Sequence, residues 1–338
     1  MKVGIIGCGL IGGKRAAALS GSRHRLAAVF DTVPERSRAL ADMHGAHVCS
    51  SLEELLSLVD AVVIATTNDQ LSALATVAVE NGKHVVLEKP AARCAAELEP
   101  VAELARAKRV IVKVGYNHRF HPAAQKAHEI VRDGECGDVM FVRARYGHGG
   151  RIGYEKEWRA DPAKAGGGEL LDQGVHLIDL ARWFIGAEFT EVSARIETYF
   201  WAMPVEDNAF VTLATAHRQV AHLHVSWTEW KNLFSFEIYA RRAKLQLEGL
   251  GGSYGPERLY HYRMRPEMGP PEMSLFEYPG ADESWALEWA DFARAVEEGT
   301  RPCGDLQDAL AALRIVDQIY GAHHRSANAP AHPPMTKR

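Results

Sequence analysis

The sequence has few cysteines, and none of them are paired in a motif. Five cysteines are scattered over 338 residues without a CxxC pair. This odd set argues against a disulfide framework and against a zinc finger, so we expect no metal and a reducing, cytoplasmic location. No apolar run approaches the roughly 20 residues that span a bilayer. The N-terminal segment MKVGIIG shows no signal-peptide pattern.

An excess of one charge sign is also missing. The chain has 39 basic and 43 acidic residues, a net charge of −4, and no run of Lys and Arg. Nucleic-acid surfaces and membrane anchors both need concentrated positive charge, so neither partner is expected. The composition, 47% hydrophobic and 24% charged, is typical of a soluble globular protein. The length predicts about two domains.

Short apolar segments alternate with helical patterns through the first 120 residues. The expected strands are 3–7, 26–31, 61–65, 84–87 and 110–115, and the expected helices are 11–19, 34–44, 52–58, 71–81 and 95–107. Strands that are apolar on both faces and alternate with helices form a parallel sheet covered on both sides. Residues 1–120 are therefore predicted to form a doubly wound α/β domain of the Rossmann type.

The pattern changes after residue 120. Segments rich in β-branched and aromatic residues predict strands at 139–148, 190–199, 209–215, 220–227, 234–240 and 244–248, with helices at 122–132, 170–185, 285–298 and 306–323. This indicates an α+β domain over 121–325 with an open, mostly antiparallel sheet, followed by a frayed tail at 326–338. One sheet face needs a cover, which favours dimerisation through this sheet.

A glycine-rich loop follows the first strand. Residues 7–12 read GCGLIG, and Asp31 ends the next strand. Gly7 permits the tight turn, Gly9 lets the backbone approach a pyrophosphate, and Gly12 allows close packing of helix on strand. The helix N-terminus attracts the phosphate charge. The cofactor contacts predicted from this loop are Gly7, Gly9, Leu10, Ile11, Gly12 and Asp31.

Asp31 also predicts which dinucleotide binds. Its carboxylate can accept hydrogen bonds from both adenosine ribose hydroxyls and repels a 2′-phosphate, so NAD is favoured over NADP. Two alternatives stay open. The glycine loop can be a turn that binds nothing, and Asp31 can cap the helix that begins at Pro34.

Two further motifs end strands of the first domain. Glu88-Lys89-Pro90 follows the strand 84–87, and residues 115–120 read GYNHRF. Ligands of open α/β sheets bind at the carboxyl ends of the strands, so Lys89 is placed to reach a cofactor or substrate. The alternative for Lys89 is an ordinary surface lysine.

A third motif opens the helix at 170–185. Residues 166–179 read GGGELLDQGVHLID, which places Asp172 and His176 at i and i+4 on one helix face, with Asp179 one turn further. A carboxylate beside an imidazole orients it and raises its basicity, as a general base requires. The alternatives are a buried, hydrogen-bonded histidine and an aspartate favoured by the helix dipole.

The order and spacing of these motifs resemble the Gfo/Idh/MocA oxidoreductases over almost the whole chain. The resemblance implies a Rossmann domain plus an open-faced sheet domain, usually in dimers or tetramers. It also implies NAD(P)-dependent chemistry at a hydroxyl carbon of a sugar, cyclitol or sugar nucleotide. By motif, Lys89 holds the substrate hydroxyl and supports the cofactor, His176 is the general acid/base, and Asp172 is its helix partner.

The remaining site residues are expected from the same resemblance. Further cofactor contacts are Thr66, Thr67, Asn68, Glu88, Lys89 and Asn117. Substrate contacts are Lys89, Asn117, Arg119, Trp158, Arg159, Asp172 and His176. One segment departs from the family, which often has a histidine a few residues past Thr-Pro-Asn. Here residues 66–71 read TTNDQL, with neither that proline nor that histidine.

Other functions remain open from the sequence. An NAD-dependent glycosidase would use the same site for transient oxidation. A non-catalytic NAD- or sugar-sensing protein needs the fold but not Lys89, Asp172 and His176. Reduction of an aldehyde or imine is disfavoured by the polar GYNHRF segment. Aromatic residues of the second domain can stack on a sugar or form sheet core, namely Tyr146, Tyr154, Trp158, Trp201, Trp227 and Trp230.

Overall fold

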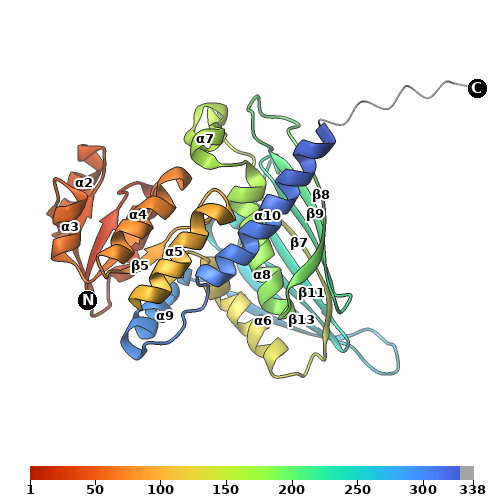
Figure 1. Cartoon of the computed structure of the whole chain (residues 1–338). Coiled ribbons are helices and arrows are strands. Elements are labelled where there is room, and N and C mark those ends of the chain that lie inside the picture. The colour runs from red at the N-terminus through yellow and green to blue at the C-terminus, as the bar shows by residue number, and fades with distance from the viewer. Residues whose placement is uncertain (328–338) are drawn as a thin grey trace, which may run out of the picture.

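The chain forms two β-sheets that lie side by side (Figure 1). The computed structural model describes residues 1–327. The first sheet is parallel, with the order β3-β2-β1-β4-β5-β6. Its strands are β1 Lys2–Ile6, β2 Arg25–Phe30, β3 His47–Val48, β4 Ala61–Ile64, β5 His84–Leu87 and β6 Val112–Val114. The Rossmann-type prediction is confirmed.

Helices connect these parallel strands. They are α1 Leu10–Leu19, α2 Pro34–His44, α3 Leu52–Leu58, α4 Asn68–Glu80 and α5 Ala95–Lys108. Local sequence sets their ends. Pro34 opens α2, and Gly45 ends it in the left-handed conformation, where glycine carries no Cβ penalty. The Ser51 side chain accepts a hydrogen bond from the Glu54 N–H and so caps α3.

The second sheet has the order β14-β13-β12-β11-β7-β10-β9-β8. Its strands are β7 Val139–Gly147, β8 Phe189–Glu197, β9 Asn208–Thr215, β10 Val220–Ser226, β11 Leu233–Ala240, β12 Ala243–Glu248, β13 Glu257–Arg263 and β14 Glu272–Tyr278. The pair β7 and β10 is parallel and the other neighbours are antiparallel. The predicted open, mostly antiparallel sheet is confirmed.

Helices cover one face of this second sheet. The helices of this part are α6 Pro122–Arg132, α7 Pro162–Ala165, α8 Val175–Ile185, α9 Ser284–Glu298 and α10 Leu306–Ala327. Short 3₁₀ turns lie at Asn117–Phe120, Tyr154–Lys156, Trp158–Ala160 and Gly252–Tyr254. α6, α8 and α10 lie between this sheet and the first unit, and no described helix covers the opposite face (Figure 1).

The helix expected at 170–185 begins differently from the prediction. Residues Leu170–Gly174 form a π-helical turn, and the α-helix α8 starts only at Val175. A π-turn widens the backbone and rotates the side chains it carries away from the regular i, i+4 positions. The turn therefore changes which way Asp172 faces relative to His176.

Helix α9 belongs to the core of the first unit, although it follows the second sheet in the chain. It packs on α1, and its Trp289 and Phe292 side chains are buried among apolar residues of β1 and β2. The second part of the chain thus completes the core of the first. The boundary at residue 120 stays a prediction.

The sequence analysis did not predict three of the strands. β3 has only two residues, too few to produce a pattern, and β13 and β14 flank a segment rich in Met, Pro and Gly. Of the tail expected at 326–338, residues 326 and 327 end α10, and the rest lies outside the described residues. Within residues 1–327 no helix combines the length and apolar character that crossing a bilayer requires.

The packing of α9 generates a stability prediction. Phe292 is fully buried on this helix, whereas Leu287 on the same helix is 41% exposed. Phe292→Ala leaves a cavity and is expected to lower the free energy of unfolding by about 3–5 kcal/mol. Leu287→Ala, the matched control, should change it by less than about 1 kcal/mol. Urea unfolding of both variants checks this, and equal losses would contradict the buried role of Phe292.

Candidate active site

The glycine loop between β1 and α1 has the shape that a dinucleotide needs. Gly7 has φ +93°, and a Cβ there would collide with the Ala65 carbonyl oxygen; a Cβ on Gly12 would collide with the Gly7 carbonyl oxygen. A Cβ on Gly9, in contrast, would meet nothing within 4 Å. Gly7 and Gly12 therefore allow tight packing, and Gly9 leaves open space at the start of α1, where a pyrophosphate fits.

The other residues predicted for the cofactor surround this loop. Leu10 is exposed and Ile11 half-buried at the first turn of α1. Asp31 directly follows β2, and its Oδ2 accepts a hydrogen bond from the Cys8 N–H at 2.6 Å. Its Oδ1 accepts from the Val33 N–H at 2.8 Å, so the carboxylate braces the glycine loop and the entry to α2.

The three predicted cofactor residues after β4 make different contacts. Thr66 lies beside Gly7, because a Cβ on that glycine would come 3.1 Å from the Thr66 methyl group. The Thr67 hydroxyl donates to Asp69 at 2.6 Å. Asn68 is buried, and its amide donates to the Ala165 carbonyl at 2.9 Å. Asn68 therefore ties the first unit to α7, and its cofactor contact stays a prediction.

The centre of the site is an ion pair between Lys89 and Asp172. The Lys89 Nζ donates to Asp172 Oδ1 at 2.7 Å and to the Asp172 main-chain oxygen at 2.6 Å. The Arg159 guanidinium binds the other oxygen, Oδ2, at 3.2 Å. Burial raises the pKa of the Asp172 carboxyl, but the charges of Lys89 and Arg159 outweigh it and hold that pKa below its usual range.

His176 lies beside this ion pair in a buried position. Burial, and after it the positive charge of Lys89, lower the pKa of His176 well below its usual range, so the imidazole is neutral at neutral pH. Its Nδ1 is enclosed and has no hydrogen-bond partner in the described chain, whereas Nε2 is not enclosed. Nε2 is thus the less enclosed of the two ring nitrogens.

The predicted pairing of Asp172 with His176 is wrong. The carboxylate of Asp172 is taken by Lys89 and Arg159. The π-turn that carries Asp172 breaks the i, i+4 spacing on which that pairing rested. Asp179 is used elsewhere as well, since it binds the Arg119 guanidinium with both oxygens, at 2.7 and 2.5 Å.

Three predicted contact residues point into the protein. Arg119 is buried in its ion pair with Asp179, so it is not free for a substrate. Glu88 is buried and receives the Arg15 Nε–H at 2.6 Å, so its carboxylate holds the loop after β5 instead of facing a cofactor. Asn117 is buried and donates to the Ser284 hydroxyl at 3.0 Å. Buried charges and amides need such partners, which explains their inward orientation.

Trp158 and Arg159 are brought to the site as expected. The Arg159 guanidinium lies 4.6 Å from the Trp158 ring centre, a cation–π distance. A small space beside them is lined by Asn68, Trp158, Arg159, Ala165, Gly167, Gly168, Asp172 and Trp227. Trp227 is fully buried with Tyr154 and Val205 in a small core, and Trp230 is exposed. Trp158 therefore lines a space that also borders Asp172.

Three titratable groups near the site received no role in the sequence analysis. The ring of His118 lies 3.9 Å from that of His176. Burial lowers the pKa of His148, and the negative charge of Asp172 partly offsets this lowering. Burial, reinforced by Asp172, raises the pKa of Glu169 well above its usual range, and neither carboxyl oxygen has a described partner. His118 stood in the GYNHRF motif, but nothing in the sequence showed that its ring meets His176.

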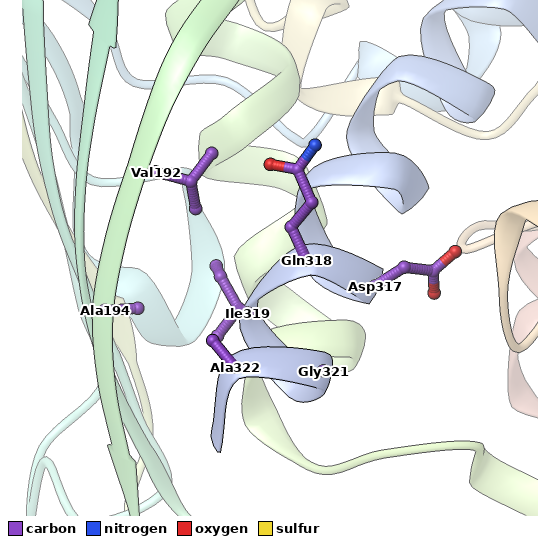
Figure 2. Close-up of a pocket in the computed structure, with 7 residues that line it drawn as sticks. All are labelled: Val192, Ala194, Asp317, Gln318, Ile319, Gly321 and Ala322. Carbon is purple, nitrogen blue, oxygen red and sulfur yellow. The ribbon is translucent and has the colours of Figure 1, made fainter. Parts of the chain in front are cut away.

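Two other features lie apart from this cluster. A cavity of about 490 Å³ between β8 and α10 shares no residue with it, and the Asp317 side chain there accepts from the Ala95 N–H at 3.0 Å (Figure 2). His47, Cys49 and Glu54 lie close enough to hold a metal ion. Glu54 already accepts hydrogen bonds from His47 and Ser50, so the cap of α3 accounts for its position.

Comparisons with known proteins agree with this fold. Residues 1–116 match the model for the oxidoreductase family with an NAD-binding Rossmann fold, and residues 124–246 match the GFO/IDH/MocA C-terminal domain. Inositol 2-dehydrogenase of Rhizobium meliloti is 26% identical over 330 residues, covering 94% of this chain and 95% of that protein. D-xylose 1-dehydrogenase (NADP(+)) 2 of Haloferax volcanii is 26% identical over 327 residues, covering 95% and 96%.

A solved structure extends the likeness to the whole fold. Levoglucosan dehydrogenase in complex with NADH and levoglucosan has a TM-score of 0.87 and 22% identity, covering 96% of this chain and 97% of that chain. Both family models, the glycine loop and the two-sheet architecture agree. The chain therefore belongs to the Gfo/Idh/MocA family of oxidoreductases with an NAD-binding Rossmann domain.

Proposed function

We propose that the protein is an NAD(P)-dependent dehydrogenase that transfers a hydride between the nicotinamide and a hydroxyl carbon of a sugar, cyclitol or sugar nucleotide. The observation that carries this proposal is the neutral, buried His176 of α8 beside the Lys89–Asp172 ion pair. Lys89 follows β5, in the same parallel sheet whose β1 leads into the glycine loop. Relatives named for inositol, xylose and levoglucosan support the substrate class.

The geometry of the glycine loop fits the cofactor. Gly9 leaves open space at the start of α1 that a pyrophosphate would occupy, and no described side chain caps this helix N-terminus. When bound, NAD(P) supplies the hydride acceptor. The protein's task is then to orient the substrate alcohol and to move its proton.

Lys89 is placed to bind the reacting hydroxyl oxygen. An ammonium group has three N–H donors, and Asp172 takes two of them through its carboxylate and main-chain oxygens. The third donor can bind the substrate oxygen and stabilise the negative charge that develops on it. Asp172 fixes the direction of this donor, because it holds the ammonium from the opposite side.

His176 is placed to take the proton. A neutral imidazole is a base, and burial beside Lys89 keeps His176 in that form. Nε2 receives the hydroxyl proton during oxidation and returns it during reduction. Trp158 and Arg159 lie next to the same ion pair, where they can contact the sugar ring and its other hydroxyl groups.

We also infer a preference for NAD over NADP, a cytoplasmic location and a homodimer or homotetramer. Asp31 places a carboxylate beside the glycine loop, where a 2′-phosphate would meet like charge. The five cysteines are all free, which fits a reducing compartment. The uncovered sheet face carries ring stacks such as Phe141 on Tyr239, at 4.4 Å, which fit a subunit interface.

The first prediction from this proposed function concerns the side chains of His176 and Lys89. His176→Gln and Lys89→Met are each expected to lower kcat by roughly 10²–10⁴-fold, because they remove the base and the charge that stabilises the alkoxide. His176→Gln should leave NAD affinity unchanged in calorimetric titration. Lys108→Met, at an exposed position of α5, is the control. Turnover near the wild-type rate in either site variant would refute these roles.

A substrate screen tests the function as a whole. Purified protein with NAD is offered sugars, cyclitols and sugar nucleotides, and NADH formation is followed. Net NADH with a matching carbonyl product is expected. Cleavage of an aryl glycoside without net NADH would instead show the glycosidase, and ligand binding without any turnover would show a sensor.

The second prediction concerns the choice of cofactor. Wild-type kcat/KM is expected to be at least about tenfold higher with NAD than with NADP, because a carboxylate disfavours a second anion nearby. Asp31→Asn keeps an acceptor for the Cys8 N–H but removes the charge, and it should reduce this ratio. Asp42→Asn, at an exposed position of α2, should leave the ratio unchanged. A wild-type preference for NADP would contradict the role of Asp31.

The third prediction concerns assembly. Light scattering coupled to size exclusion should give the mass of a dimer or tetramer. Phe141→Glu places an unpaired charge on the uncovered face and is expected to shift the protein towards monomer. Leu58→Glu, an exposed apolar position on α3 in the first unit, is the control. A wild-type monomer at every concentration would contradict the interface.

A further inference from the structure

Glu169 is a buried carboxyl group that the proposed mechanism does not use. It lies three residues before Asp172, directly before the π-turn Leu170–Gly174, and it is fully buried. Neither of its carboxyl oxygens has a hydrogen-bond partner among residues 1–327. A buried carboxylate needs hydrogen-bond donors or a paired cation, because losing water costs a charged group far more than a neutral one. The groups around Glu169 therefore decide whether it is charged.

The donors at the start of this turn are directed at a different carboxyl group. The main-chain N–H groups of Gly168 and Leu170 both donate to Oε1 of Glu206, at 3.1 Å each. The N–H of Glu169 itself donates to the Glu206 main-chain oxygen at 3.0 Å. The Tyr320 hydroxyl on α10 adds another donor to Oε1 of Glu206, at 2.7 Å. Glu206 thus takes these donors, and the side chain of Glu169 receives none of them.

The two cations of the site are directed at Asp172. Lys89 Nζ binds Oδ1 at 2.7 Å, and Arg159 Nε binds Oδ2 at 3.2 Å. Asp172 therefore has the partners that an ionised carboxylate requires, whereas Glu169 has none in the described chain. Burial, and after it the negative charge of Asp172, raises the pKa of Glu169 well above its usual range, and Lys89 offsets only part of this rise. Glu169 is neutral at neutral pH.

The other titratable groups that face Glu169 add no positive charge. They are the phenols of Tyr146 on β7 and of Tyr154 and Tyr254 on two 3₁₀ turns, together with the Glu206 carboxyl. Burial raises the pKa of each phenol, so all three are uncharged at neutral pH. Burial also raises the pKa of Glu206, which its hydrogen bonds partly offset. None of these groups can pair with a carboxylate as a cation would.

We propose that Glu169 is held as an uncharged carboxyl group and that its ionisation at high pH switches the active site off. The site then contains two carboxyl side chains, Glu169 and Asp172, but one negative charge, against the two positive charges of Lys89 and Arg159. The surplus positive charge stabilises the alkoxide that forms in the proposed dehydrogenase reaction, on which this inference rests. An ionised Glu169 cancels the surplus, so Lys89 stabilises the alkoxide less. Glu169 is thus a positioning residue that acts through Lys89.

The first test reads the protonation of Glu169 directly and needs no substrate. Infrared spectra of the wild-type protein and of Glu169→Gln are recorded at neutral pH, where the C=O stretch of a protonated carboxyl group is distinct from the bands of a carboxylate. The difference spectrum separates Glu169 from other buried carboxyl groups such as Glu206. We expect the variant to lose a protonated-carboxyl band. Loss of a carboxylate band would overturn the proposal, whether or not the protein proves to be a dehydrogenase.

The second test follows stability against pH. A glutamate of the unfolded chain has a pKa of about 4.3, whereas native Glu169 keeps its proton, so the stability that this proton contributes is lost as pH rises. Relative to Glu169→Gln, the unfolding equilibrium constant of the wild type is expected to rise about tenfold per pH unit between about pH 5 and 8. Glu103→Gln, at an exposed position of α5, is the control and should give a constant ratio. A constant ratio for Glu169→Gln would contradict a neutral Glu169.

The third test follows kcat against pH with the best substrate from the screen. Wild-type kcat is expected to fall at high pH as Glu169 ionises, and Glu169→Gln, which cannot ionise, should move this basic limb up by about one pH unit or more. A basic limb at the same pH in both proteins, or none in the wild type, would overturn the switch.

A second variant and the substrate-free readouts keep the outcomes separate. If Glu169→Gln does not fold, Glu169→Met, which is neutral and of similar length, should give the same infrared and pH effects. If no substrate turns over, the proposed dehydrogenase function fails, and the infrared and unfolding measurements still decide the charge of Glu169.

Discussion

The ion pair between Lys89 and Asp172 is the contact on which the site depends. It joins the end of β5 to the π-turn before α8, two segments 83 residues apart in the chain. The same contact aims the third N–H of Lys89, fixes the turn that leads into His176, and places a positive charge that helps keep the imidazole neutral. This pair is only partly buried, and its desolvation cost offsets much of its attraction, so it specifies one arrangement more than it adds stability.

Buried ion pairs behind the site hold the loops that carry it. Arg15 binds both Glu88, next to Lys89, and Glu288 on α9, so the loop after β5 is tied to a helix from the end of the chain. Arg119 binds Asp179 on α8. The polar residues of the motifs thus divide into two groups. Lys89, Asp172 and His176 meet at the site, whereas Glu88 and Arg119 hold the surrounding elements in place.

The sequence predicted what depends on local pattern. Apolar strands alternating with helices indicated the parallel sheet, and the spacing of the glycines indicated the phosphate loop. Local pattern could not predict contacts between segments that are far apart in the chain. The i, i+4 spacing assigned Asp172 to His176, but Lys89 and Arg159 bind the carboxylate and a π-turn carries it. Arg119 looked like a substrate contact because nothing local shows that Asp179 lies against it. His118 and His176 meet only once the two units pack.

The most direct test of the proposed chemistry follows the hydrogen that moves. The best substrate from a screen is prepared with deuterium on the carbon that bears the reacting hydroxyl and is incubated with NAD. The account predicts one carbonyl product for each NADH, with the deuterium on C4 of the nicotinamide. Deuterium released to water, or product formed without net NADH, would contradict it.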